Sequence, residues 1–343
     1  MKKVLYISKF NNNAIGRIDK EFKLYNQNNS EIYFLKIFPY HNNKFIYLYK
    51  IFITFISILY HSFFYKIIHF SSPDTYANFI QPVLFFKKII ITVHHLEKYW
   101  PFSWMGKMIM RTANVIMPVS NFTKIQLIND LNVNEKKIII NNIGINPDYY
   151  QDLKKNYKHF PYFLYIGDEY PRKNLKNILS GFKLVSEKYP ELKLLKIGKT
   201  SDPNDAINTD RFIQELGLKD KVILKRNFFT VSELREHYSN ALCLLLISKV
   251  EGFGRPIAEA MACGCPVITA NRPPMTEIAS PSQLKADPEN IYDIAEKMNL
   301  IISNTNLQKK IIKEGLNFSK QFSLENFAKR TYEIYEKVIN TNG

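Results

Sequence analysis

Short apolar runs alternate with stretches of helical spacing along most of the chain. Runs at residues 4–8, 89–93, 162–166 and 242–248 contain no charged residue, which is typical of parallel strands covered on both faces. Residues 174–182 place leucine, isoleucine and phenylalanine at helical spacing. This alternation predicts an α/β protein built on parallel sheets.

Residues 241–270, ALCLLLISKVEGFGRPIAEAMACGCPVITA, hold the clearest example of this pattern. The apolar run stops at Lys249, and a glycine-rich loop follows it. Pro256 suits a first helical position, and Gly264 suits the end of that helix. We therefore expect a strand, loop, helix and strand, with a ligand at the carboxyl end of the first strand.

Two glutamates flank the start of this helix, Glu251 in the loop and Glu259 in the predicted first turn. Free amides at the helix start, including those of Ile257 and Ala258, would bind a diphosphate. Two carboxylates would repel a bare phosphate, but they would accept hydrogen bonds from hydroxyl groups. A nucleotide sugar satisfies both demands. The alternative is a surface loop with an ordinary acid near a helix start.

A second loop of this kind occurs in residues 161–182, PYFLYIGDEYPRKNLKNILSGF. Gly167 ends the predicted strand, so Arg172 and Lys173 fall on a strand-to-helix loop. Two cations there would neutralise a leaving diphosphate. Composition alone would instead favour a solvated basic pair.

Two histidines, His94 and His95, follow the predicted strand at 89–93. They therefore stand at a carboxyl strand end, where open α/β sheets place functional groups. The alternative for either is a structural histidine with its hydrogen bonds satisfied.

These segments resemble family 4 of the retaining GT-B glycosyltransferases, most specifically in EGFGRPIAEAMACGCPVI at residues 251–268. The resemblance implies that Glu251 contacts donor-sugar hydroxyls, that Glu259 contacts the nucleotide ribose, and that basic residues in the RKN segment bind the donor diphosphate. It implies His94, Lys173 and Glu251 as catalytic residues. It implies donor binding by Gly167, Arg172, Lys173, Glu251, Gly252, Phe253, Gly254, Ile257 and Glu259.

Three segments depart from this family pattern. Asp168 stands where many members carry an arginine, although Arg172 offers a substitute cation. The first loop, residues 9–16, has only Gly16 in place of a glycine pair. Lys225 and Arg226 stand where a strand-ending glycine is common.

The resemblance covers most of the chain and implies a GT-B fold, in which two Rossmann-like parallel-sheet domains face a cleft. A length of 343 residues agrees with two domains. We expect an acceptor-side domain at 1–155, a nucleotide-sugar-binding domain at 156–320, and a C-terminal helix at 321–343 that packs back on the first domain. The boundary falls in the polar stretch DLKKNYKHFP.

A net charge of +16 favours an anionic partner. No nucleic-acid-binding motif occurs, which leaves a nucleotide or an anionic membrane, although A/T-rich coding bias would also raise the lysine content. The three cysteines lack metal-ligand spacing, and MKKVLYIS is too short for a signal peptide. These features predict a cytoplasmic protein, peripheral on the inner membrane face.

Residues 45–70 raise the membrane question directly, because 51–65 contain no Asp, Glu, Lys or Arg. A spanning helix needs about 20 such residues. Two interpretations stay open: a buried helix followed by a strand at 66–70, or a helix that lies on a membrane surface.

The predicted function is metal-independent, retaining transfer of a hexose from a nucleotide-diphosphate sugar to a glycan or lipid-linked acceptor, in cell-surface polysaccharide or glycolipid synthesis. No D-x-D triplet occurs to bind a metal, and we expect no cofactor. The alternatives are a nucleotide-sugar epimerase, a non-catalytic GT-B partner subunit and, more remotely, a glycoside hydrolase using two carboxylates.

Overall fold

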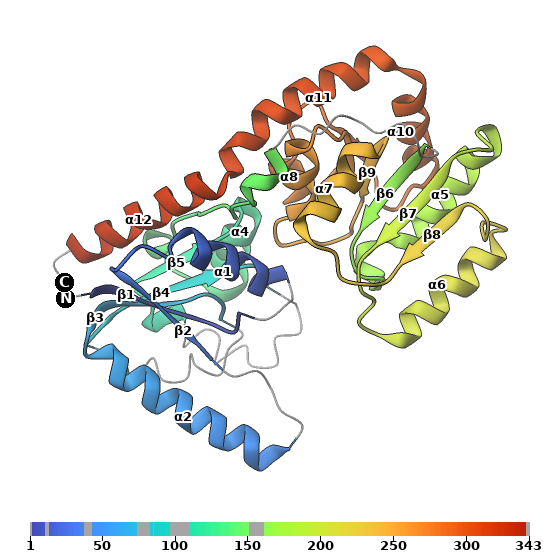
Figure 1. Ribbon diagram of the computed structural model, residues 1–343. Coiled ribbons are helices and arrows are strands. Elements are labelled where there is room, and N and C mark those ends of the chain that lie inside the picture. Colours follow the sequence, from blue (N-terminus) through green and yellow to red (C-terminus); the bar gives the residue numbers. More distant parts are fainter. Residues whose placement is uncertain are drawn as a thin grey trace. The chain divides into compact units, whose positions relative to one another are not determined.

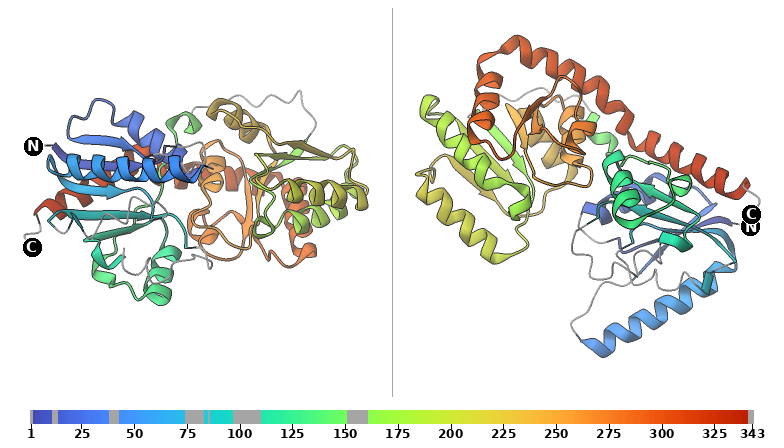
Figure 2. Two further views of the ribbon diagram at one scale, coloured as in Figure 1. Left: turned by 90° about the horizontal axis from the view of Figure 1, so that it is seen from below. Right: turned by 180° about the vertical axis from the view of Figure 1, so that it is seen from behind.

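The computed structural model describes residues 2–10, 14–37, 43–73, 83–84, 86–96, 110–150 and 161–340 (Figures 1 and 2). The chain forms two compact units. The first unit comprises Met1–Gly144 with Leu324–Gly343, and the second comprises Ile145–Ser323. The boundary predicted near residue 155 lies outside the described residues, and the first unit closes earlier, at Gly144.

The first unit is built on a five-stranded parallel sheet in the order β2-β1-β3-β4-β5. Isoleucines and leucines pair across it, as in Leu5 with Ile68 and Ile68 with Ile89. The order reverses between β1 and β3, which is the type of position where open sheets bind ligands. The strands are β1 Lys2–Ser8, β2 Ile32–Lys36, β3 Tyr65–Phe70, β4 Lys88–Val93 and β5 Val115–Pro118.

Helices cover both faces of this sheet (Figures 1 and 2). Leu127 of α4 and Ile58 of α2 belong to the apolar core on one face. Phe22 of α1 and Phe327 of α12 belong to the core on the other face, where their rings lie 5.4 Å apart. These helices are α1 Ala14–Tyr25, α2 Lys44–Ser62, α4 Asn121–Leu131 and α12 Leu324–Asn340, with a 3-10 turn, η2, at Glu135–Lys137.

The second unit contains a six-stranded parallel sheet in the order β11-β10-β9-β6-β7-β8. Because β6 lies between β7 and β9, the winding reverses between β6 and β9, and a ligand crevice is expected outside their carboxyl ends. The strands are β6 Tyr162–Ile166, β7 Lys193–Ile197, β8 Val222–Lys225, β9 Cys243–Leu246, β10 Val267–Ala270 and β11 Leu284–Ala286.

The helices of the second unit connect these strands. They are α5 Leu175–Lys188, α6 Pro203–Glu215, α7 Val231–Asn240, α8 Arg255–Ala262, α9 Met275–Ile278, α10 Ile291–Ser303 and α11 Thr305–Ser319. The 3-10 turns are η3 Pro147–Tyr150, η4 Pro171–Lys173 and η5 Lys320–Phe322. After η5 the chain returns to the first unit as α12.

The local predictions agree closely with these elements. The strand predicted at 162–166 is β6, and the strand predicted at 89–93 is β4 with one further residue at its start. Helix α8 begins at Arg255, one residue earlier than predicted, because Gly254 is the N-cap at φ 87°. Glu259 is therefore in the second turn of α8, and its assignment to the first turn was wrong.

Helix α2 is not buried. Only 17% of its residues 45–62 are buried, which contradicts the buried-helix interpretation. The strand predicted after it is present as β3.

Candidate functional site

The loops after β6 and β9 are joined at the point where the sheet of the second unit reverses. The backbone N–H of Lys249 donates to the carbonyl of Arg172 at 2.8 Å. The side-chain amide of Asn174 donates to the carbonyls of Ile247 at 3.0 Å and Pro288 at 2.8 Å. Asn174 adopts left-handed φ 62°, which ends η4 and turns the chain into α5. These bonds fix the two predicted donor loops against each other.

Lys173 and Glu251 meet across these loops. The Lys173 Nζ lies 2.5 Å from Glu251 Oε1, and the Ser248 hydroxyl donates to the same carboxylate oxygen at 2.8 Å. The side chains are only 17% and 9% exposed. Burial by itself raises the pKa of Glu251, but the charge and hydrogen bond of Lys173, with those of Ser248 and Arg172, outweigh burial and lower that pKa. Glu251 is therefore a negatively charged acceptor at neutral pH.

Arg172 lies beside this pair and is exposed. Its Nη1 is 3.5 Å from the carbonyl oxygen of Val250, so the guanidinium lies along the loop after β9. Two positive groups, one partly buried and one exposed, thus stand beside the Glu251 carboxylate. Such a group of charges can bind an anion and a hydroxyl at adjacent positions.

The glycine loop and the start of α8 differ in detail from the prediction. The backbone N–H of Ile257 donates to the carbonyl of Gly254 at 2.8 Å, so the prediction of a free Ile257 amide was wrong. The side chain of Phe253 packs edge-on against Phe322, with ring centroids 5.6 Å apart. Phe253 and Gly252 therefore contribute to the loop after β9 through their backbone, and Ile257 is fully buried.

Glu259 is already bound by protein groups. Its Oε1 lies 2.9 Å from Arg255 Nε, and Tyr238 donates its hydroxyl proton to Oε2 at 2.9 Å. The carboxylate is 1% exposed. Contact with a ribose stays a prediction for this residue.

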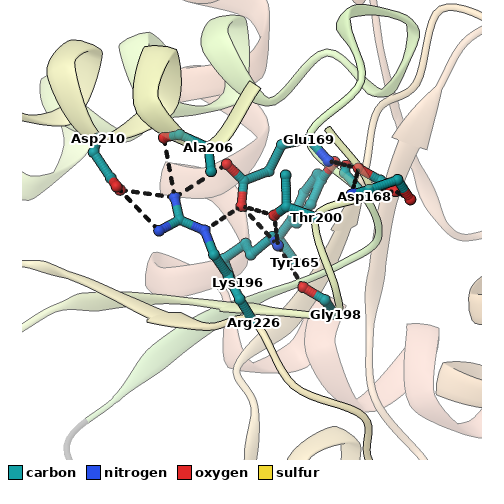
Figure 3. Close-up of polar contacts among 10 residues, drawn as sticks. Tyr165, Asp168, Glu169, Lys196, Gly198, Thr200, Ala206, Asp210 and Arg226 are labelled. Atoms are coloured by element: carbon teal, nitrogen blue, oxygen red, sulfur yellow. Dashed lines mark hydrogen bonds and ion pairs between the residues drawn. The ribbon is translucent and has the colours of Figure 1, made fainter. Parts of the chain in front are cut away.

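Gly167 and Asp168 connect the loops after β6 and β7. At Gly198, where φ is +121°, a Cβ atom would lie 3.0 Å from the carbonyl oxygen of Gly167. Asp168 accepts a hydrogen bond from the Ser201 hydroxyl and another from the Ser201 amide at 3.2 Å (Figure 3 shows its neighbourhood). Asp168, one of the departures noted in the sequence, therefore links the loops after β6 and β7.

An ion cluster with a buried centre lies next to Asp168 (Figure 3). Glu169 pairs with Lys196 at 2.8 Å and with Arg226 at 2.7 Å, and the Thr200 hydroxyl donates to it. Arg226 also pairs with Asp210 on α6 at 2.7 Å. The side chains of Glu169 and Lys196 are fully buried. We call Glu169, Lys196, Thr200, Asp210 and Arg226 the Glu169 cluster.

The Glu169 cluster explains a departure noted in the sequence. Arg226 follows β8, and its guanidinium reaches both oxygens of Glu169 after β6. Burial raises the pKa of Glu169, but hydrogen bonds from Arg226, Lys196 and Thr200 outweigh burial and lower that pKa to about 2. Sequence reasoning missed Glu169 and Lys196. The available signal was Lys196 itself, a charge between Leu195 and Ile197 inside the strand KLLKI.

The predicted catalytic histidine belongs to the first unit, at the carboxyl end of β4. His94 is 7% exposed, and its Nε2 is 3.1 Å from the carbonyl oxygen of Ser71, which follows β3. Burial, and then the neighbouring His95, lower the pKa of His94 to about 4 despite the bond to Ser71. His94 is therefore a neutral ring at physiological pH.

A second buried polar group, also missed by sequence reasoning, lies at the reversal point of the first sheet. Asp19 accepts hydrogen bonds from the Tyr6 hydroxyl at 2.7 Å and from the Ser8 hydroxyl. Burial raises the pKa of Asp19 to about 6, against the lowering effect of its hydrogen bonds from Ser8, Tyr6 and Ser71. No motif pointed to it, because an acid within a helix is ordinary in sequence.

Residues 150–318 match the family model described as "Glycosyl transferases group 1". The chain is 27% identical over 238 residues to the O-antigen chain mannosyltransferase B of Escherichia coli, covering 66% of this chain and 61% of that protein. It is 30% identical over 210 residues to the O-antigen chain mannosyltransferase RfbU of Salmonella typhimurium, covering 58% and 57%. The match thus spans about three fifths of these relatives.

Among solved structures, a glycosyltransferase from Rickettsia africae superposes with a TM-score of 0.81 at 20% identity, covering 99% of both chains. This likeness and the two parallel sheets confirm the predicted GT-B fold. The assignment to family 4 within the group stays a prediction. Residues 150–318, which contain both of the paired loops, thus match the family model of the group 1 glycosyltransferases.

Proposed function

We propose that this protein is a retaining glycosyltransferase that moves a hexose from a nucleotide-diphosphate sugar to a glycan or lipid-linked acceptor. The proposal rests on one observation: Lys173 and Glu251, joined at 2.5 Å, lie with Arg172 at the reversal of the parallel sheet. This location suits a nucleotide, and the mixed charges suit a diphosphate beside sugar hydroxyls. The mannosyltransferase relatives support a hexose as the group transferred.

In the proposed reaction the acceptor hydroxyl attacks the anomeric carbon on the face from which the diphosphate leaves. The carbon–oxygen bond to the phosphate breaks, a new bond to the acceptor oxygen forms, and the hydroxyl proton passes to a phosphate oxygen. No enzyme nucleophile is required. Lys173 and Arg172 offset the charge that develops on the leaving group, which is where electrostatic stabilisation lowers a barrier most.

Glu251 accepts hydrogen bonds from the donor-sugar hydroxyls in this mechanism. Its pKa is lowered, so it stays ionised and acts only as an acceptor. Glu259 takes the same role toward the ribose hydroxyls. His94 is neutral at physiological pH, so it positions the reacting groups by hydrogen bonding and adds no positive charge.

The base and sugar of the donor are tested by ligand binding. Purified protein is heated with UDP-, GDP-, ADP- and dTDP-sugars, and a ligand raises stability by RT ln(1 + [L]/Kd). We expect one base to shift the melting temperature well beyond the others. The shift should disappear in Glu251→Gln with Lys173→Ala, and it should persist when the exposed Lys176 is changed to alanine.

Transfer itself is tested with a radiolabelled form of the sugar that binds and with membrane or polysaccharide fractions as acceptor. Label in a product of larger mass supports the proposal. Interconversion of the donor without an acceptor would identify an epimerase. Donor binding without turnover on any acceptor would identify a non-catalytic subunit.

Metal independence forms part of the proposal, because Lys173 and Arg172 supply the positive charge beside the leaving group. Turnover is expected to be unchanged in EDTA. Loss of turnover that magnesium reverses would contradict this expectation. We also propose a cytoplasmic location, since nucleotide sugars are made there and all three cysteines are free thiols.

A further inference from the structure

Helix α2 turns its apolar side chains outward. Thr54, Ile58 and Ser62 form its buried side. The opposite side carries a stripe at three- and four-residue spacing in which each side chain is 50% or more exposed. These residues, the α2 stripe, are Phe45, Leu48, Tyr49, Phe52, Ile56 and Tyr60. An ordinary surface helix has the reverse arrangement, so the α2 stripe marks an interaction surface.

The apolar surface continues past the end of α2. Phe63 and Phe64 are 64% and 50% exposed. The ring of Phe63 stacks on that of Phe86, with centroids 6.0 Å apart, and Phe86 is itself 47% exposed. Aromatic side chains therefore extend the α2 stripe toward the start of β4.

The sequence that contains this surface carries acidic or basic side chains of one sign only. Residues 32–73 contain no Asp or Glu, and they contain Lys36, Lys44, Lys50 and Lys66. Lys36 and Lys66 are exposed on β2 and β3, the strands flanking β1. Aromatic residues with nearby lysines match the interface of an anionic bilayer, where rings enter the headgroup region and ammonium groups meet lipid phosphates.

The attachments of α2 favour a helix that lies in the plane of the membrane. By length and composition, residues 45–62 could cross a bilayer, with a mean hydropathy of 1.4. Yet Phe55 and Leu59 pack against the core of the first unit, and Ser62 leads through two residues into β3 of its sheet. A spanning orientation would pull α2 off that core, whereas an interfacial one exposes no new surface.

We propose that the α2 stripe, with Phe63, Phe64 and Phe86, seats the first unit on an anionic lipid surface. A second copy of the chain is the competing occupant. The lysines argue against it, because a two-fold contact would bring like charges from both copies together. The proposal goes beyond sugar transfer and needs no nucleotide, so its test is independent of the proposed function.

The test is co-sedimentation of the full chain with vesicles, without nucleotide sugar. Vesicles of phosphatidylcholine with phosphatidylglycerol are compared with phosphatidylcholine alone, at low and at high salt. The protein is expected to pellet with the anionic vesicles and to be released partly by salt. Tyr49→Ser with Phe52→Ser should weaken the apparent vesicle affinity roughly tenfold or more.

A matched control is available in the second unit. Tyr292 and Ile207 are 71% and 55% exposed, and Tyr292→Ser with Ile207→Ser removes similar apolar surface outside the α2 stripe. This control should pellet like the parent. Phe52→Trp keeps an aromatic ring. Because the chain already has Trp100 and Trp104, each emission spectrum is taken as the difference from that of the parent. The difference should shift to shorter wavelength on anionic vesicles for Phe52→Trp and should not shift for Tyr292→Trp.

Light scattering of the lipid-free protein distinguishes a lipid surface from a second copy of the chain as the partner of the α2 stripe. The proposal would be overturned if the parent were a dimer that did not pellet with vesicles, and if Tyr49→Ser with Phe52→Ser converted that dimer to a monomer. The surface would then be assigned to a second copy of the chain. Equal pelleting of the stripe variant and the control would overturn the proposal too. The proposal would be supported if the parent and the control pelleted in a salt-sensitive way and Tyr49→Ser with Phe52→Ser did not.

Discussion

The ion pair of Lys173 and Glu251 is the residue-scale feature on which the proposed chemistry depends. The Glu251 carboxylate fixes the position of the Lys173 ammonium group. That group stands where the diphosphate would leave. Removing either partner leaves the other as a mostly buried, uncompensated charge. Effects on turnover must therefore be separated from effects on folding.

Lys173→Ala is expected to lower kcat by roughly 100-fold or more, because it removes charge stabilisation of the leaving group. The measurement is initial rate with saturating donor, together with circular dichroism to establish folding. Lys176→Ala, at an exposed position on α5, is the control and should keep normal turnover. Near-normal turnover in folded Lys173→Ala would remove Lys173 from the site.

His94 should titrate far below an ordinary histidine, near pH 4, because it is buried beside His95. Folding lowers the pKa of His94, so as the pH falls the imidazole is protonated in the unfolded chain before it is protonated in the folded one. His94 therefore contributes stability above about pH 6.5 that is lost as the pH falls toward 4. Ring proton NMR resonances, assigned by their loss in His94→Asn, should stay unshifted from pH 8 to 5. A midpoint near pH 6.5 would rule out this burial.

At the scale of elements, three loops at the carboxyl ends of β6, β7 and β8 are held together by the Glu169 cluster. Glu169 lies two residues before η4, the turn that carries Arg172 and Lys173. The cluster therefore fixes the base of the loop that presents these cations. Asp168 adds a second link, to Ser201 after β7.

Glu169→Gln is expected to destabilise the protein by about 3 kcal/mol at pH 7, from the depressed pKa of a fully buried carboxylate. A lowered carboxylate pKa gives stability that is present above about pH 4.5 and is lost as the pH falls toward 2. The difference from the parent should therefore shrink over that interval. Urea unfolding at several pH values measures it, with the exposed Glu187→Gln as control. A gap that does not change with pH would contradict the ionic origin.

The sequence predicted these elements better than their contacts. Apolar runs and glycines located β6, β9 and both donor loops, because burial on two faces leaves a local pattern. The Glu169 cluster went unpredicted because Glu169, Lys196 and Arg226 are distant in sequence and meet only through strand order. The free amide at Ile257 was wrong for a local reason, since a left-handed Gly254 turns its own carbonyl toward that N–H. The sequence could not show which side of α2 faces outward, because the helix is apolar on most sides.

At the scale of the whole molecule, the two ends of the described chain share one unit. Helix α12 supplies Phe327 to the core of the first unit, and Thr331 of α12 accepts a hydrogen bond from the Asn141 side chain at 2.8 Å. His69 of β3 bonds Tyr335 of the same helix at 2.6 Å. The first unit is therefore incomplete without residues that follow the entire second unit.

Phe327→Ala should destabilise the first unit by about 3–5 kcal/mol, the usual effect of removing a buried ring. Hydrogen exchange followed by mass spectrometry can assign the effect to one unit. Amides of β1 and β3 should exchange faster, while those of β6 and β9 should keep their protection. Lys329→Ala on the exposed side of α12 is the control. Equal loss of protection in both units would argue against the assignment of α12 to the first.

The place of α12 in the chain has a consequence for biosynthesis. A ribosome makes residues 145–323 as one uninterrupted stretch, so the second unit can fold as soon as it emerges. The first unit is translated earlier, yet on one face of its sheet, with Tyr6 and Ile67, α1 is joined by α12 only once residues 324–340 have been made. The unit begun first is thus the last to be completed, and one face of its sheet stays only partly covered throughout synthesis of the second unit.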